Sequence, residues 1–324
     1  MMKRIIELCM KMYRITVYTL ILGIVASCCS CVNATKPTLK LQYQKIFEED
    51  TVDFVVPFGS EGIICSLNSN EMLVLSNDGT EIMRESYSSE IVDIDGAFAT
   101  PRRITVALSN NEVITYEFKS EAVSVKYNQL FDHRVVAVSS VDLFTDMELV
   151  LLETGDLYGY GENYKSILSE DEEEDVLIET PLLIACDVTD LSEFAYVTED
   201  GICYRIPFGV VADSLPSDEV ELYSYCRGPM VCTEDTAYSL TIDTAEWEQE
   251  ANIDSGFVST YDMCILYRHN GIWYYTGNLS ARPVGKGTPV AENEKVKLPE
   301  GYSYQVAYAG IIGYDEHTVI IYSV

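Results

Sequence analysis

Few side chains in this 324-residue sequence have the types and spacing that catalysis needs. The three histidines, His133, His269 and His317, are scattered and none has a paired ligand nearby, so no zinc site is predicted. No serine lies in a GxSxG motif, and neither a phosphate-binding loop nor a dinucleotide fingerprint occurs. Among 52 Asp and Glu residues, no spacing singles out the carboxylate pair of a glycosidase. We therefore expect no catalytic residue, no metal and no cofactor.

Cysteine is the other reactive residue type, with ten copies. Six of them follow the N-terminal segment, mostly inside apolar, strand-like runs and without CxxC spacing: Cys65, Cys186, Cys203, Cys226, Cys232 and Cys264. We expect them to be small buried hydrophobic side chains. A disulfide between Cys226 and Cys232 or between Cys186 and Cys203 stays open, because an oxidising compartment would permit either.

The N-terminal segment is typical of an export signal. Basic residues within positions 1–14 precede an apolar stretch of about a dozen residues from Ile15 to Ala26, which is short for a membrane span. The stretch ends in Val25-Ala26-Ser27-Cys28, which resembles the bacterial lipobox, where an aliphatic and two small residues precede a cysteine that is lipidated after cleavage.

This resemblance implies a signal peptide at residues 1–27 and acyl chains on Cys28 that hold the protein to the membrane. Cys29 and Cys31 leave the cleavage register open. The alternatives are an uncleaved signal anchor and a cleaved signal with incidental cysteines. In each case the rest of the chain is extracytoplasmic. Residues 28–50 are mostly polar and are expected to form the lipidated N-terminus and a tether.

The charge balance is strongly acidic, with 21 Lys and Arg against 52 Asp and Glu and a formal net charge of -31. Nucleic acid is not an expected partner, because it is bound through clusters of Lys and Arg that this sequence lacks. The acidity is explained by the solubility of an exposed domain; binding of cations or basic partners is the alternative. The acidic run at 169–175 is expected to be a solvated loop, because it lacks the alternating ligands and glycine of a Ca²⁺ loop.

Residues 51–324 show almost no helical periodicity and consist of apolar, strand-like runs separated by turns rich in Asn, Asp and Gly. The same strand-turn-strand unit recurs at 63–82, 103–118, 149–163, 194–207, 229–242, 263–278 and 311–324. A β-rich period of about 40 residues predicts a propeller, so we expect an all-β, single-domain, seven-bladed β-propeller. A pair of stacked sandwiches is the alternative. The apolar end of the chain, Thr318 to Val324, is predicted to be a paired strand of the last blade, beside strands from the N-terminal part of the ectodomain that follows the export signal.

The third unit contains Glu153-Thr154-Gly155-Asp156-Leu157-Tyr158-Gly159-Tyr160-Gly161-Glu162-Asn163, which resembles the RCC1-type repeat. The positions that carry the resemblance are Gly155, Asp156, Tyr158, Tyr160, Gly161 and Asn163. The resemblance implies that Gly155 lies in the hairpin turn, that Gly161 allows a close approach at the strand end, and that Asn163 bonds back to the loop. The Gly-Gln-Leu-Gly that usually follows in the family is reduced here to Leu168.

The RCC1-like resemblance implies interaction surfaces rather than catalysis. Three consecutive aromatic residues, Trp273, Tyr274 and Tyr275, are candidates for binding a protein or glycan on a propeller face, although packing between blades would also explain them. We therefore expect a cell-surface, lipid-anchored, non-enzymatic binding module. The alternatives are a glycan-directed extracytoplasmic hydrolase with carboxylates at the propeller channel and a structural lipoprotein without a stable partner.

Overall fold

The computed structural model describes residues 38–45, 52–58, 62–76, 78–97, 102–119, 122–141, 146–163, 168, 176–193, 195–206, 209–212, 214–217, 220–225, 228–241, 246–254, 258–261, 264–278, 289–298, 304–311 and 316–323. The predicted lipidation site, Cys28, and the acidic run at 169–175 lie outside these residues. One compact unit extends from Thr38 to Val324. Among the described residues, no helix is long and apolar enough to span a membrane.

The described residues form strands, and six sheets hold four strands each, in chain order. Blade 1 contains β2 (Val52–Phe58), β3 (Gly62–Leu67), β4 (Glu71–Ser76) and β5 (Glu81–Ser86). Blade 2 contains β6 (Ile91–Ala97), β7 (Arg102–Leu108), β8 (Glu112–Lys119) and β9 (Ala122–Leu130). Blade 3 contains β10 (Val135–Val141), β11 (Met147–Leu152), β12 (Leu157–Glu162) and β13 (Leu177–Ala185).

The next three sheets repeat the pattern. Blade 4 contains β14 (Val188–Ser192), β15 (Ala195–Thr198), β16 (Cys203–Arg205) and β17 (Gly209–Ala212). Blade 5 contains β18 (Glu221–Tyr225), β19 (Gly228–Cys232), β20 (Thr236–Thr241) and β21 (Glu246–Asn252). Blade 6 contains β22 (Val258–Tyr261), β23 (Cys264–His269), β24 (Ile272–Asn278) and β25 (Pro289–Val296). Each blade is an antiparallel meander in which strands that follow each other in the chain pair with each other.

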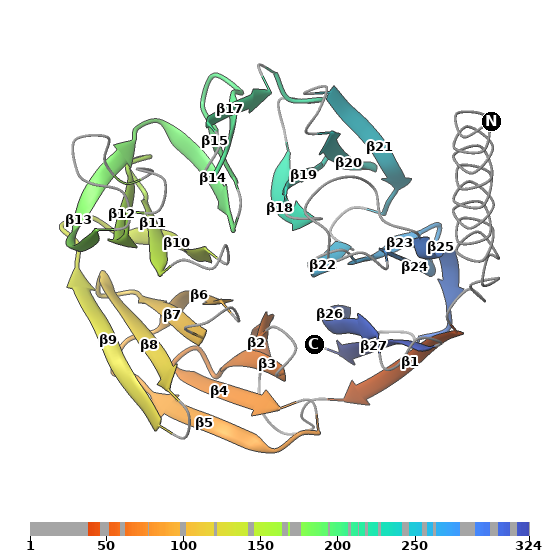
Figure 1. Ribbon diagram of the computed structural model, residues 1–324, viewed down its shortest axis with the longest axis horizontal. Coiled ribbons are helices and arrows are strands. Elements are labelled where there is room, and N and C mark those ends of the chain that lie inside the picture. Colours follow the sequence, from red (N-terminus) through yellow and green to blue (C-terminus); the bar gives the residue numbers. More distant parts are fainter. Residues whose placement is uncertain are drawn as a thin grey trace, which may run out of the picture. The chain divides into compact units, whose positions relative to one another are not determined.

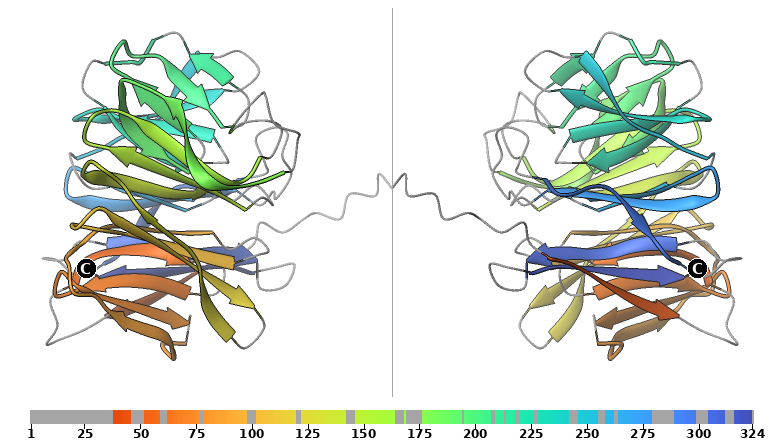
Figure 2. Two further views of the ribbon diagram at one scale, coloured as in Figure 1. Left: turned by 90° about the vertical axis from the view of Figure 1, so that its left-hand side faces the viewer. Right: turned by 90° about the vertical axis from the view of Figure 1, so that its right-hand side faces the viewer.

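A seventh sheet has only three strands, in the order β1 (Thr38–Lys45), β27 (Glu316–Ser323) and β26 (Tyr304–Ile311). β27 pairs antiparallel with β26 and parallel with β1, with Leu41 opposite Val319. The right-hand view of Figure 2 shows β1 beside β27. The predicted pairing of the apolar chain end is therefore confirmed. The fold also begins at Thr38 rather than at residue 51, because β1 lies within the segment expected to be a tether.

The sheets follow one another around a ring (Figure 1). The innermost strand of each sheet contacts that of the next, from β2 through β6, β10, β14, β18 and β22 to β26, and β26 contacts β2. This closed order defines a β-propeller. The predicted count of seven blades is corrected to six, because the sheet that joins the two ends has three strands and a parallel pair that no blade contains.

The hydrophobic core lies between neighbouring blades, so the second strand of a blade is mostly apolar and is buried on both faces. Every residue of β3 and of β11 is buried. Ile64 of blade 1 and Val106 of blade 2 belong to one cluster, and Leu149 of blade 3 and Val188 of blade 4 belong to another. Burying one such side chain contributes about 1.5–3 kcal/mol, which explains why the blades are stable only side by side.

Cys65, Cys203 and Cys232 are buried free thiols, as the strand-like runs predict, and burial raises their pKa to about 12. Cys186 is a free thiol too, but it is exposed, so no bridge joins it to Cys203 in this structure. The side chains of Cys226 and Cys264 lie outside the described part of the chain.

Candidate functional site

The hairpin of blade 3 has the geometry that the repeat pattern predicts. Gly155 has a φ of +82°, and its N–H donates to the carbonyl of Leu152 at 3.0 Å in the turn. Thr154 Oγ1 donates to Asp156 Oδ2 at 2.8 Å and closes the turn from its side-chain side. A Cβ on Gly155 would also lie 3.3 Å from the Cα of Asp187, so both the backbone conformation and the space there favour glycine.

The two tyrosines of the motif pack blade 3 against blade 2. Tyr160 is fully buried with its ring edge-on to Tyr127, at 5.2 Å between centroids, and Tyr158 is edge-on to Phe131 at 5.7 Å. Such aromatic pairs contribute about 0.5–1.5 kcal/mol beyond the area that they bury. The motif tyrosines therefore have a packing role.

The last two motif residues fix the end of the hairpin. Gly161 has a φ of +107°, and a Cβ there would lie 1.9 Å from the carbonyl oxygen of Asp146. The buried Asn163 accepts a hydrogen bond at Oδ1 from the N–H of Leu168, at 2.9 Å, which is the bond back to the loop that the resemblance implies. All six positions thus have a structural account, within blade 3 or at its contact with blade 2.

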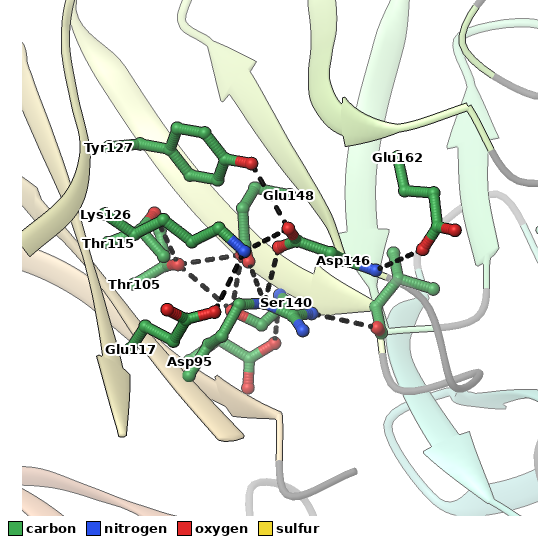
Figure 3. A network of polar contacts seen from close by, with 12 residues as sticks. Asp95, Thr105, Thr115, Glu117, Lys126, Tyr127, Ser140, Asp146, Glu148 and Glu162 are labelled. Carbon is green, nitrogen blue, oxygen red and sulfur yellow. Dashed lines mark hydrogen bonds and ion pairs between the residues drawn. The ribbon is translucent and has the colours of Figure 1, made fainter. Parts of the chain in front are cut away.

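A buried polar cluster lies at the contact of blades 2 and 3 (Figure 3). Arg103 of β7 and Glu148 of β11 are almost fully buried, and Arg103 Nε donates to Glu148 Oε1. The hydroxyls of Thr105 and Ser140 donate to Glu148 Oε2 at 2.7 and 2.6 Å. Glu148 is therefore paired and hydrogen-bonded on both oxygens, which offsets the cost of burying it.

Lys126 of β9 is the cation of a second group in this cluster. Its ammonium donates to Asp146 Oδ2 across the blade contact and to Glu117 Oε1 at 3.1 Å (Figure 3). Burial alone would raise the pKa of Glu117, but hydrogen bonds from Lys119 and Lys126 outweigh it and hold that pKa below its ordinary value. Tyr127 also donates to Asp146 Oδ2, at 3.2 Å, so one carboxylate gathers donors from two side chains of β9.

Aspartates in the innermost strands form a further tie between blades. Asp95 Oδ2 accepts from the N–H of Ser140 at 2.9 Å, and Asp93 Oδ2 accepts from the N–H of Val138 at 2.8 Å. Burial raises the pKa of Asp93 to about 7 and of Asp95 to about 6. Asp190 accepts from Leu222 N–H at 2.8 Å in the same way between blades 4 and 5. Sequence reasoning missed this tie, although an Asp recurring inside an apolar run was its visible signal.

Acidic residues from two blades do meet in this cluster, as the hydrolase alternative requires. Glu148, Asp146 and Glu117 are each paired with Arg103 or Lys126, however, and Glu148 is 0% exposed. A substrate cannot reach such groups. The cluster therefore joins two blades and does not make a catalytic carboxylate pair.

An open groove of about 370 Å³ lies between the outermost strand of blade 5 and the central hairpin of blade 6. It is lined by Gln249, Glu250, Ala251, Asn252, Tyr267, His269 and Tyr274. Tyr267 and Tyr274 are opposite each other on β23 and β24, with centroids 5.4 Å apart and planes 14° from parallel. Lys295 of β25 places its Nζ 6.0 Å from the centroid of the Tyr274 ring, within the range of a cation–π contact.

Glu250 owes its position to a β-bulge. Ala237 pairs with Ala251 and Tyr238 with Gln249, so Glu250 is the extra residue on β21. Its Oε1 accepts a hydrogen bond from Ser239 Oγ. Among the described residues, no Lys or Arg forms an ion pair with Glu250, and His269 Nδ1 is buried without a hydrogen-bond partner. The groove therefore presents a carboxylate and aromatic rings together.

The three consecutive aromatic residues alternate across blade 6. Trp273 and Tyr275 are buried, at 7% and 0% exposed, whereas Tyr274 is partly exposed and lines the groove. Of the three candidates, Tyr274 thus has access to a ligand. The other lining residues were not singled out from the sequence, because the bulge that turns Glu250 into the groove depends on strand register.

The described residues contain no group of three or more His, Cys, Asp or Glu that could hold a metal ion. No protein family model matches the chain, and no curated protein matches it.

Solved structures resemble this chain in fold. The crystal structure of human WBSCR16 matches with a TM-score of 0.57 and 12% identity over 80% of this chain and 85% of that chain. The β-propeller domain of Cps50 (Swd1) from Myceliophteria thermophila matches with a TM-score of 0.49 and 8% identity over 79% and 92%. At such identity the likeness to the human protein supports the fold alone, a β-propeller.

Proposed function

We propose that the protein is a lipid-anchored, extracytoplasmic β-propeller with RCC1-like repeats that acts as a non-enzymatic binding module. The observation that carries the proposal is the groove between blades 5 and 6, where a carboxylate without an ion-pair partner among the described residues and a partly exposed tyrosine line one open depression. The acidic groups between blades 2 and 3, in contrast, are neutralised inside the protein. Concave sites with a few placed polar groups and aromatic walls are typical of binding sites.

A capture experiment tests the binding function. The full-length protein, reconstituted in nanodiscs of zwitterionic lipid, is exposed to an extract of the producing cells' surface. We expect saturable capture of a partner that Tyr274→Ala weakens. The matched control is Tyr204→Ala, because Tyr204 stacks on Tyr196 at 4.8 Å in blade 4, away from the groove. Absence of saturable capture, or equal loss in both variants, would contradict the proposal.

The anchor has its own test. Because Cys28 follows Val25-Ala26-Ser27 behind a short apolar stretch, Cys28→Ala should release the protein from the membrane fraction or leave it unprocessed. The comparison is the size and membrane partitioning of wild type and variant, with Cys31→Ala as the control for the cleavage register. A Cys28→Ala variant of unchanged size and partitioning would overturn the lipoprotein assignment.

A further inference from the structure

We infer that the groove between blades 5 and 6 binds a cationic side chain, an arginine or lysine, presented by a basic partner protein. The inference rests on the proposed binding function and names the chemistry of its partner. It follows from three properties of the groove: the unpaired charge at its bulge, the aromatic wall and the charge of the whole chain.

The outermost strand of each of blades 1 to 5 has a bulge residue, and the polarity and charge of that residue differ between blades. It is Ile82 in blade 1, Lys126 in blade 2, Ile184 in blade 3, Val211 in blade 4 and Glu250 in blade 5. Three of these five residues are apolar, so a charge at this position is a departure from the repeat.

The two charged bulge residues have opposite surroundings. Lys126 reaches across the blade contact to Asp146 of blade 3 and to Glu117, which neutralise it. Glu250 faces blade 6 and has no cationic partner among the described residues; its hydrogen-bond donor is the hydroxyl of Ser239. The described residues thus leave the Glu250 carboxylate available to a cation of a ligand.

The wall of the groove suits a cation as well. Tyr274 already has an ammonium, that of Lys295, 6.0 Å from its ring centroid, and Lys295 is exposed. A ligand guanidinium can take the same position by displacing this flexible side chain, while its N–H groups reach the Glu250 carboxylate. Ala251 contributes no side chain beyond Cβ, which leaves room for an inserted residue.

The charge of the chain favours the same class of partner. With a formal net charge of -31, the protein repels anionic ligands and attracts basic ones, and this attraction raises the rate of encounter. A neutral glycan could bind to the polar groups of the groove, but the net charge of the protein would not attract it. Dependence on ligand charge and on salt therefore separates the two classes.

The test is a titration of the full-length protein in zwitterionic nanodiscs with a short alternating Gly-Arg peptide. The isosteric Gly-citrulline peptide, which lacks the charge, is the control ligand. Isothermal titration calorimetry is a suitable readout, because the protein's two tryptophans, Trp247 and Trp273, are not among the residues that line the groove. We expect the citrulline peptide to bind about tenfold more weakly, and added salt to weaken the arginine peptide further.

Variants assign the charge to one residue. Glu250→Gln keeps the size and the acceptor for Ser239 but should cost the arginine peptide about tenfold in affinity. Glu246→Gln, on the same strand and exposed, removes the same charge and should change the affinity less than about twofold. A thermal melt of each variant confirms that it is folded.

Several outcomes would overturn the inference: no binding of the arginine peptide, equal binding of the citrulline peptide, or equal effects of Glu250→Gln and Glu246→Gln. A different result would assign the groove to a glycan and reject a cationic ligand: a cello-oligosaccharide binds, Glu250→Gln abolishes that binding, and the arginine peptide does not bind. If the arginine peptide does not bind but Tyr274→Ala still weakens capture from the surface extract, a cationic ligand is rejected and the binding function stands. Failure of that capture rejects the binding function itself.

Discussion

Blades 2 and 3 and blades 5 and 6 meet through the same structural position, the bulge residue of an outermost strand, but they treat its charge differently. Lys126 is held by Asp146 and Glu117 in a contact from which solvent is largely excluded. Glu250 instead lines an open groove beside Tyr274. A charge inside a sealed contact must be neutralised by the protein, whereas a charge in an open groove stays hydrated and available to a ligand. The charged bulge residue thus stabilises the contact between blades 2 and 3, whereas between blades 5 and 6 it is available to bind a ligand.

The largest effect should come from breaking the sealed contact. Glu148→Gln removes the carboxylate that Arg103 and two hydroxyls contact, which leaves a buried cation short of its partner. We expect a loss of about 3 kcal/mol in the free energy of unfolding, measured by denaturant titration. The same change in the groove, Glu250→Gln, should cost less than about 0.5 kcal/mol. Equal losses in the two variants would contradict the distinction.

The next effect tests the apolar bulge of blade 3. Ile184 packs against the buried cluster between blades 3 and 4, as Tyr196 does, and it also covers Gly159. Because Gly159 has no side chain, a carboxylate at position 184 would find no hydroxyl donor there. Ile184→Glu should therefore destabilise the protein by about 2–4 kcal/mol. Ile82, the bulge residue of blade 1, is 41% exposed, and Ile82→Glu should be nearly neutral. A tolerated Ile184→Glu would show that the bulge position of blade 3 is open and would contradict this account.

A smaller effect of opposite sign is expected from filling the groove. Glu250→Ile introduces the residue type of blades 1 and 3 beside Tyr267 and Tyr274. We expect it to raise the free energy of unfolding by about 0.5–1 kcal/mol, because an apolar side chain there packs against the two tyrosine rings. A melt shifted downwards would mean that Glu250 supports the fold rather than a ligand.

The pH dependence of stability should reveal the aspartates that join the innermost strands of blades 2 and 3. The pKa of Asp93 is about 7 in the folded protein against an ordinary 3.8, because burial and the nearby Asp95 outweigh the N–H donor of Val138. The folded state then holds a proton that the unfolded state has lost between these values, so this contribution to stability falls as pH rises from about 4 to about 7. Relative to Asp93→Asn, the wild type should lose stability over that window. Parallel stability curves for the two proteins would rule out this coupling.

Much of the architecture could be predicted from the sequence because its signals are local. The hairpin of blade 3 needs glycine at Gly155 and Gly161, where φ is positive, and both positions could be recognised from their neighbours alone. The recurrence of such hairpins predicts a propeller for the same reason. The chain end from Thr318 onwards was predictable as a paired strand, because an apolar run is costly as a free tail.

The closing sheet and the groove could not be predicted in this way, since both depend on pairing between distant segments. β1 pairs in parallel with β27, which lies almost the whole chain away in the sequence. The short alternation of apolar residues in β1 was therefore interpreted as part of a tether. Glu250 reads as one of many surface acids until the bulge on β21 places it opposite blade 6. A one-residue change of register moves every side chain of a strand to the other face, so neither periodicity nor composition locates the groove.

The central claim is that the groove between blades 5 and 6 binds the partner and that the contacts around it only build the propeller. The most direct measurement is the affinity of the captured partner for a double variant, Ser239→Gly with Glu250→Ile, which gives blade 5 the Gly159 and Ile184 pair of blade 3. The account predicts a loss of affinity of at least about tenfold in a protein that melts no lower than wild type. An unchanged affinity in the folded double variant would contradict it.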